Sequence, residues 1–126
     1  MKQEDIKFSF ENLTVWQNSI EFSKNIYELT KYFPKEEFYG LTSQIRRAAV
    51  SISLNIAEGK GRYHKKEFIQ FLYLARGSLY EVITCPKLSK QLHYIPKTQE
   101  PTTKSLMQYA FTIQSQLSGL ISYLKA

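Results

Sequence analysis

Residues 43–62 read SQIRRAAVSISLNIAEGKGR, and this stretch says more about the architecture than any other part of the chain. Its apolar side chains recur at spacings of four, three and four residues, so they lie on one side of an α-helix. This apolar stripe consists of Ile45, Ala49, Ile52 and Ile56. A helix with one apolar side buries that side against other elements, so the stretch predicts a packed helical protein.

A second stripe on the same helix is polar. It consists of Arg47, Ser51, Asn55, Glu58 and Arg62. Buried polar groups must find hydrogen-bond partners, and a neighbouring helix supplies them, so one interpretation is a structural polar seam between two helices. The seam would comprise Arg47, Ser51, Asn55, Glu58, Ser78 and Glu81. If it is buried, truncating Arg47 should cost about 3–5 kcal/mol; the other interpretation is a recognition face for a ligand.

Three further segments have the length and apolar pattern of helices. The expected helices span residues 13–33, 36–58, 64–93 and 102–124. Pro34 ends the first helix because proline lacks the backbone N–H, and Gly59 is expected to cap the second. No segment alternates as a strand does. The chain therefore predicts an all-α fold, an antiparallel up-down four-helix bundle, as a single domain over residues 1–126 with residues 1–11 poorly ordered.

The first expected helix carries two apolar stripes. One consists of Leu13, Trp16, Ile20 and Tyr27. The other, about 140° away, consists of Val15, Phe22, Ile26, Leu29 and Phe33. A bundle core uses one such stripe fully, and an exposed apolar patch marks an interaction site. We therefore expect the second stripe to be an oligomer interface. The alternative is one wide surface that faces the core.

Composition limits the classes of protein. With 126 residues, 43% of them hydrophobic and 14% aromatic, the chain is large and apolar enough for one packed core. A single cysteine, Cys85, excludes an internal disulfide and fits a reducing compartment. No segment reaches the ~18 apolar residues of a membrane span, and the N-terminus lacks a signal-peptide pattern. We expect a cytoplasmic protein with no membrane partner.

Side chains suited to catalysis are few and scattered. His64 and His93 lie at opposite ends of the third expected helix, too far apart to share a metal. Cys85 has no nearby histidine or basic cluster that would lower its pKa. Glu58 and Glu81 are spaced to pair with cations (Arg62 for the first, Arg46 or Arg47 for the second), which favours ion pairs over acid–base chemistry. We expect no catalytic, cofactor or metal site, and no enzymatic activity.

The sequence also resembles a known family. The residues that carry the resemblance are the run QIRRAAVSI and NIAEG within residues 44–59, Leu13 and Trp16, Phe33-Pro34, and ARGSLYE at residues 75–81. They resemble a bacterial four-helix-bundle family encoded in intervening sequences of large-subunit ribosomal RNA genes. Members usually carry proline where Ser53 stands and a Gln-Leu pair where Cys85-Pro86 stands, so bundle geometry at these positions should differ.

The resemblance has consequences for assembly and activity. It covers about residues 8–125 and implies a small up-down bundle that assembles as a homopentamer and has no established enzymatic activity. The family is similar in fold to the accessory variability protein of diversity-generating retroelements, a basic pentameric bundle that binds nucleic acid and a reverse transcriptase. The resemblance therefore implies a homo-oligomer.

The charge is concentrated where the second helix joins the third. The chain carries a net charge of +6, and residues 41–67 hold six Lys and Arg against two Glu. Clustered cations of this kind indicate a polyanion partner. We expect a nucleic-acid surface for structured RNA, comprising Arg46, Lys60, Arg62, Tyr63, Lys65 and Lys66; the family resemblance makes ribosomal RNA one candidate. The competing hypothesis is a scaffold that binds another protein and has no nucleic-acid role.

Overall fold

The structure, a computed structural model, describes residues 6–126, and over this range it is helical without any strand. The four long helices are α1 (Thr14–Thr30), α2 (Leu41–Lys60), α3 (Lys65–Gln91) and α4 (Glu100–Lys125). Three short 3-10 helices, η2 (Ser9–Asn12), η3 (Lys35–Glu37) and η4 (Lys97–Gln99), precede α1, α2 and α4. The all-α prediction with four helices is confirmed.

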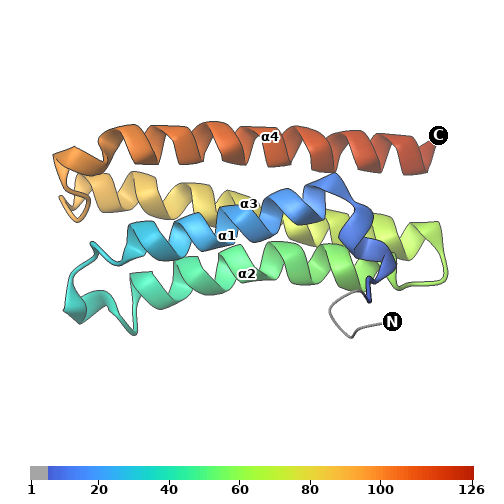
Figure 1. The fold of residues 1–126 in the computed structure, drawn as a ribbon, viewed down its shortest axis with the longest axis horizontal. Helices are drawn as coiled ribbons and strands as arrows, with labels where there is room; N and C mark the ends of the chain where they lie inside the picture. The colour runs from blue at the N-terminus through green and yellow to red at the C-terminus, as the bar shows by residue number, and fades with distance from the viewer. Residues whose placement is uncertain (1–5) are drawn as a thin grey trace.

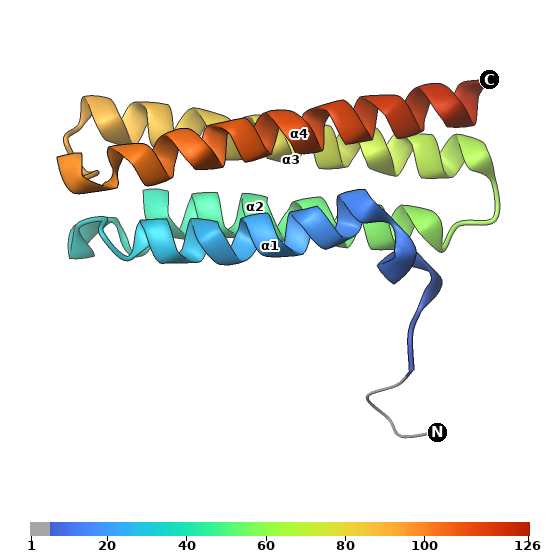
Figure 2. The same cartoon turned by 45° about the horizontal axis from the view of Figure 1, so that its top comes forward.

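The four helices lie along one long axis (Figure 1). Consecutive helices run in alternate directions, in agreement with the expected up-down arrangement. The α2–α3 connection, the C-terminal end of α4 and η2 lie at one end of the bundle, and the α1–α2 and α3–α4 connections lie at the other (Figure 1). In the view of Figure 2, α3 and α4 form one layer and α1 and α2 form the other.

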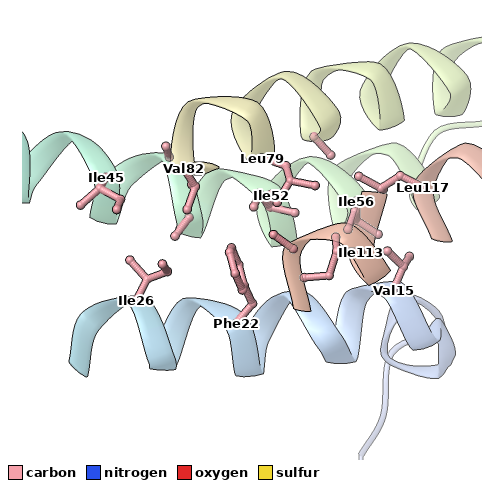
Figure 3. Close-up of a cluster of buried hydrophobic side chains, with 14 of the residues drawn as sticks. Val15, Phe22, Ile26, Ile45, Ile52, Ile56, Leu79, Val82, Ile113 and Leu117 are labelled. Carbon is pink, nitrogen blue, oxygen red and sulfur yellow. The ribbon is translucent and has the colours of Figure 1, made fainter. Parts of the chain in front are cut away.

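The core forms where the apolar sides of the four helices meet (Figure 3). The predicted stripe of α2 is fully buried there, facing Leu79 and Val82 of α3 and Ile113 and Leu117 of α4. Phe22 of α1 points between the helices into this cluster (Figure 3). The hydrophobic effect on these side chains therefore holds all four helices together.

The burial of α1 corrects the expected oligomer interface. Each residue of that stripe lies inside the chain's own core, and Phe33, the most exposed of them, is only 7% exposed; the stripe is Val15, Phe22, Ile26, Leu29 and Phe33. The physical reason is that buried serines beside the stripe allow close contact with α2, because the Ser23 hydroxyl donates 2.9 Å to the Ala49 carbonyl. The outward stripe is the other one, in which Ile20 is 44% and Tyr27 40% exposed.

Helix ends also differ from expectation. The second helix begins at Leu41, later than predicted, because Glu37 belongs to η3 and its carboxylate accepts the Leu41 N–H at 3.2 Å. Gly59 lies inside α2 and is buried, and Gly61 is the residue that ends the helix. Part of the range 1–11, residues 1–5, lies outside the described residues, whereas its end from Ser9 is ordered as η2.

Candidate nucleic-acid interface

The α2–α3 connection carries most of the predicted RNA contacts. The Gly61 N–H donates to the Ala57 and Glu58 carbonyls, both at 3.2 Å, and the chain then turns before α3 begins at Lys65. Tyr63, in this turn, is 93% exposed, with its ring edge-on to that of His64 at 4.8 Å between centroids. A ring held at the tip of a turn with a free face is suited to stacking on a base.

Three lysines lie close to Tyr63 along the chain. Lys60 ends α2, and Lys65 and Lys66 open α3; all three are exposed. Within residues 6–126 none of these ammonium groups makes a hydrogen bond or ion pair, although Lys60 Nζ lies 6.0 Å from the centre of the Phe68 ring. We call Lys60, Tyr63, Lys65 and Lys66 the loop surface. Its positive charge is free to meet an anion.

Arg62 forms the ion pair with Glu58 that its spacing predicts. Its guanidinium pairs with Glu58 at 3.3 Å and with Glu67 at 4.0 Å, and it lies 4.8 Å from the centre of the Phe71 ring. Two carboxylates offset its charge, while its position over Phe71 ties the turn to α3. Arg62 therefore holds the loop surface in place.

Arg46 does not belong to the loop surface, which corrects the prediction. It lies fourteen residues before Lys60 on α2, about 21 Å away along the helix. Its Nε donates to the Thr30 hydroxyl at 2.8 Å and its guanidinium lies 4.7 Å from the centre of the Tyr27 ring. A second donor reaches the Tyr27 carbonyl at 3.3 Å. The last carbonyls of a helix attract cations, so Arg46 fastens α2 to the end of α1.

A second cationic cluster lies on α3 and α4 and was missed by sequence reasoning. Lys125 Nζ donates 2.7 Å to the Tyr73 hydroxyl, and the Arg76 guanidinium lies 4.8 Å from the centre of the same ring. The hydrogen bond from Lys125 lowers the pKa of Tyr73 below its ordinary value. The three-residue spacing of Tyr73 and Arg76 was a visible signal, but Lys125 is 52 residues away and joins them only when α4 packs on α3.

The polar seam is present in part. The Ser51 and Ser78 hydroxyls share a hydrogen bond of 2.8 Å across α2 and α3, and Asn55 Nδ2 donates to Ser51 Oγ at 3.0 Å. Glu81 is also held across these helices, by Gln44 Nε2 at 3.1 Å. The seam interpretation therefore fits this part of the stripe, whose small side chains bring the two helices together.

Two residues that were predicted to belong to the seam lie outside it. Arg47 is exposed and, in the part of the chain that is described, makes no hydrogen bond or ion pair. Glu58 is exposed and pairs with Arg62. The spacing placed both on the correct side of α2, but their long side chains extend past the contact with α3 into solvent, where charge is well hydrated. The expectation that Arg47 is a buried, paired charge is wrong.

The groups considered for catalysis lie apart. His64 precedes α3 and His93 follows it. Cys85 is buried, and its burial followed by the charge of Glu81 raises the pKa of its thiol, which keeps it protonated. Residues 6–126 contain no group of three or more His, Cys, Asp or Glu arranged to hold a metal ion. None of the helices described is both long and apolar enough to cross a bilayer.

Comparison with known proteins gives the same picture of the fold. Residues 11–119 match the model of a family described as 23S rRNA-intervening sequence protein. Among solved structures, a crystal structure from Bacteroides thetaiotaomicron VPI-5482, described as a protein with unknown function from the S23 ribosomal protein family, is similar with a TM-score of 0.75. The two sequences are 26% identical, and the match covers 86% of this chain and 98% of the other. No curated protein sequence matches the chain.

Proposed function

Since the chain belongs to the 23S rRNA-intervening sequence protein family, we propose that it is a non-enzymatic protein that binds structured RNA, with ribosomal RNA as the first candidate. The observation that carries the proposal is the loop surface, where Lys60, Lys65 and Lys66 are exposed on either side of Tyr63 in the chain and form no ion pair within residues 6–126. Free ammonium groups neutralise phosphates and release counterions, which supplies most of the affinity of nucleic-acid binding. Tyr63 adds stacking on an unpaired base.

The surroundings of the loop surface support the same function. Arg62 links the two ends of the turn through its pairs with Glu58 and Glu67, which limits the motion of the turn that RNA binding must arrest. The cluster of Tyr73, Arg76 and Lys125 adds two cations on the α3–α4 layer at the end of the bundle where Figure 1 places the C-terminal end of α4. The positive field at this end thus exceeds that of the loop alone.

Self-assembly is the second part of the proposal. We place one side of the contact between copies on the outward side of α1 and α2, where Ile20, Tyr27 and Leu54 are 44%, 40% and 60% exposed; in a ring this surface meets a different surface of the next copy. Exposed apolar side chains on neighbouring helices favour association. In the homopentamer that the family resemblance implies, the loop surface would be repeated in each subunit, and several weak contacts would combine into a strong one.

Binding is tested by fluorescence anisotropy with a labelled hairpin RNA at low ionic strength. The variant Lys60→Gln/Lys65→Gln/Lys66→Gln should bind much more weakly than the unmodified protein. Its control, Lys7→Gln/Lys24→Gln/Lys35→Gln, removes the same charge from exposed positions outside the loop surface and should bind almost normally. Equal affinities for the two variants, or no binding by the unmodified protein, would reject the proposal and favour the protein scaffold.

Assembly is tested separately by light scattering after size exclusion. Ile20→Glu/Leu54→Glu places two charges on the proposed contact and should shift the protein to single subunits. Phe111→Glu, at a 67% exposed position on α4, should leave the mass of the assembly unchanged. A monomeric unmodified protein would rule out this part of the proposal and leave RNA binding to be judged alone.

A further inference from the structure

One side of α3 carries a long stripe without an acidic residue. Its members follow one another at steps of three and four residues, so they share one side of the helix. They are Lys66, Ile69, Tyr73, Arg76, Tyr80, Ile83, Lys87 and Lys90. At 1.5 Å per residue the stripe is about 36 Å long, nearly the whole bundle. Cations and rings therefore line a continuous path along α3.

The neighbouring side of α4 also carries lysines and an aromatic ring, and its stripe contains no acidic residue. Its members, again at steps of three and four, are Lys104, Met107, Phe111, Ser115, Ser118, Ser122 and Lys125. The hydrogen bond from Lys125 to Tyr73 joins the two stripes at one end. A cleft lined by Lys87, Lys90 and Lys104 joins them at the other. We call these two stripes together the α3–α4 face; its two helices form the layer opposite α1 and α2 (Figure 2).

The cleft is lined by both apolar and charged side chains. Its volume is about 320 Å³, and the apolar side chains of Pro86, Ile95 and Met107 contribute to its walls. Three ammonium groups stand around it, against the single carboxylate of Glu100. Clefts of this size hold small ligands, and this lining suits a flat apolar group that carries negative charge. A nucleobase with its phosphate has that chemistry.

The middle of the face differs from its ends. Between the two cationic clusters stand the rings of Tyr80, 44% exposed, and Phe111, 67% exposed. Exposed rings with cations on either side are what proteins use to hold single-stranded nucleic acid, since each base can stack on a ring while the lysines take the phosphates. A duplex hides the faces of its bases, so it would leave these two rings against its sugar–phosphate backbone.

We propose that the α3–α4 face binds an unpaired stretch of nucleic acid. Its phosphates meet Arg76 and Lys125 at one end and the lysines of the cleft at the other, and its bases stack on Tyr80 and Phe111. This inference rests on the proposed function and names the form of the nucleic acid that the protein takes. Two copies that met through this same face would bring like charges together, so an isologous contact here is disfavoured.

The test compares two forms of one labelled RNA of about 12 nucleotides, a length suited to single-strand sites. One form is a single strand without internal pairing, and the other is the same strand annealed to its complement. Anisotropy at low ionic strength should show tighter binding of the single strand. Tyr80→Leu/Phe111→Leu, which keeps apolar bulk and removes the rings, should weaken single-strand binding about tenfold for each ring. Duplex binding should be unaffected.

Two matched controls sharpen the result. Tyr32→Leu removes an exposed ring that follows α1 and should change nothing. Lys87→Gln/Lys104→Gln should lower the slope of log affinity against log salt by about 0.7 for each lysine, whereas Lys24→Gln/Lys35→Gln should not. Equal or tighter duplex binding, an unaffected ring variant, or dissociation of the assembly by Phe111→Glu would overturn the inference.

Failure of this inference and failure of the proposed function give different results. If the loop-surface variant loses RNA while Tyr80→Leu/Phe111→Leu and Lys87→Gln/Lys104→Gln, which leave Lys66 in place, bind normally, the proposed function stands and the inference falls. If the unmodified protein binds neither RNA form, both fall. Circular dichroism of each variant confirms that the helices remain, because all substituted side chains are wholly or partly exposed.

Discussion

Gly59 of α2 lies so close to α3 that a β-carbon built on it would stand 2.6 Å from Cβ of Phe71. A second atom, Cδ1 of Phe68, would be 3.0 Å away. Cβ of Phe71 is fixed to the α3 backbone and cannot swing aside. The glycine is therefore required for the distance between α2 and α3, and this contact also positions the turn that carries the loop surface.

Gly59→Ala should lower the free energy of unfolding by about 1–3 kcal/mol, as overpacking does in a tight contact. Alanine favours a helix more than glycine, so intrinsic propensity alone predicts the opposite sign. Gly77→Ala is the matched control, since nothing lies within 4 Å of its Cβ position, and it should stabilise by up to about 1 kcal/mol. Urea denaturation followed by circular dichroism measures both. A neutral or stabilising Gly59→Ala would show that the two helices are farther apart.

Arg47→Ala should change the free energy of unfolding by no more than about 0.5 kcal/mol, because Arg47 is exposed and unpaired within the described part of the chain. Ser78→Ala, which leaves the Ser51 hydroxyl without its partner across the helices, should cost about 1 kcal/mol. The informative result is that Ser78→Ala should lower the free energy of unfolding more than Arg47→Ala does. A loss of 3 kcal/mol or more for Arg47→Ala would restore the buried-seam interpretation for this residue.

The phenol of Tyr73 should ionise below the ordinary tyrosine pKa of 10.0, because Lys125 donates a hydrogen bond to its oxygen. Since the pKa is lowered in the folded protein, this contact stabilises more as pH rises toward 10, and the gain is lost as pH falls through the folded-state pKa. Absorbance titration should show one early-ionising tyrosine that Lys125→Gln returns to the ordinary range.

Tyr94 supplies an internal comparison for that titration. Its hydroxyl donates 2.8 Å to the Glu37 carboxylate, and this hydrogen bond raises the pKa of Tyr94. Lys125→Gln should leave this late-ionising tyrosine unchanged. If the variant shifts every tyrosine equally, or none, then Lys125 does not contact Tyr73 in solution.

His93 ends α3 with a φ of 61°, a left-handed conformation that costs a residue with a side chain about 1–2 kcal/mol. The Tyr94 N–H donates to the Ser89 carbonyl at 2.9 Å, as in a glycine-capped helix end. His93→Gly should therefore raise the midpoint of thermal unfolding. The free energy of unfolding should increase by about 0.5–1 kcal/mol, because the greater entropy of glycine in the unfolded chain offsets part of the relieved strain. Gln91→Gly, still inside α3, should lower it. A destabilising His93→Gly would mean that the histidine side chain contributes a contact of its own.

The sequence predicted what depends on local periodicity. The stripe from Ile45 to Ile56 identified α2 and its buried side because a regular spacing has one helical solution. The regular spacing of Ser51 and Asn55 placed them in the seam, where the structure shows them hydrogen-bonded to each other and Ser51 hydrogen-bonded to Ser78. The exposed lysines on either side of Tyr63 could be recognised as a cluster because they lie close together in the chain.

Periodicity could not decide what depends on packing between helices. The two stripes of α1 are both apolar, and only the neighbours of Phe22 and Ser23 determine which one is buried. Arg46 counted toward the basic cluster, yet its partners Tyr27 and Thr30 belong to another helix. Lys125 joins Tyr73 and Arg76 only because α4 packs on α3, and a local sequence pattern cannot predict a contact between such distant segments.

RNA binding through the loop surface is tested most directly by the salt dependence of affinity, measured for the unmodified protein and for Lys60→Gln/Lys65→Gln/Lys66→Gln. Affinity of the unmodified protein for a hairpin RNA should fall steeply with salt. The triple variant should reduce the slope of log affinity against log salt by about 2 to 3, near one for each lost phosphate contact. Identical slopes for the two proteins would contradict RNA binding through the loop surface, because the three lysines would then contact no phosphate.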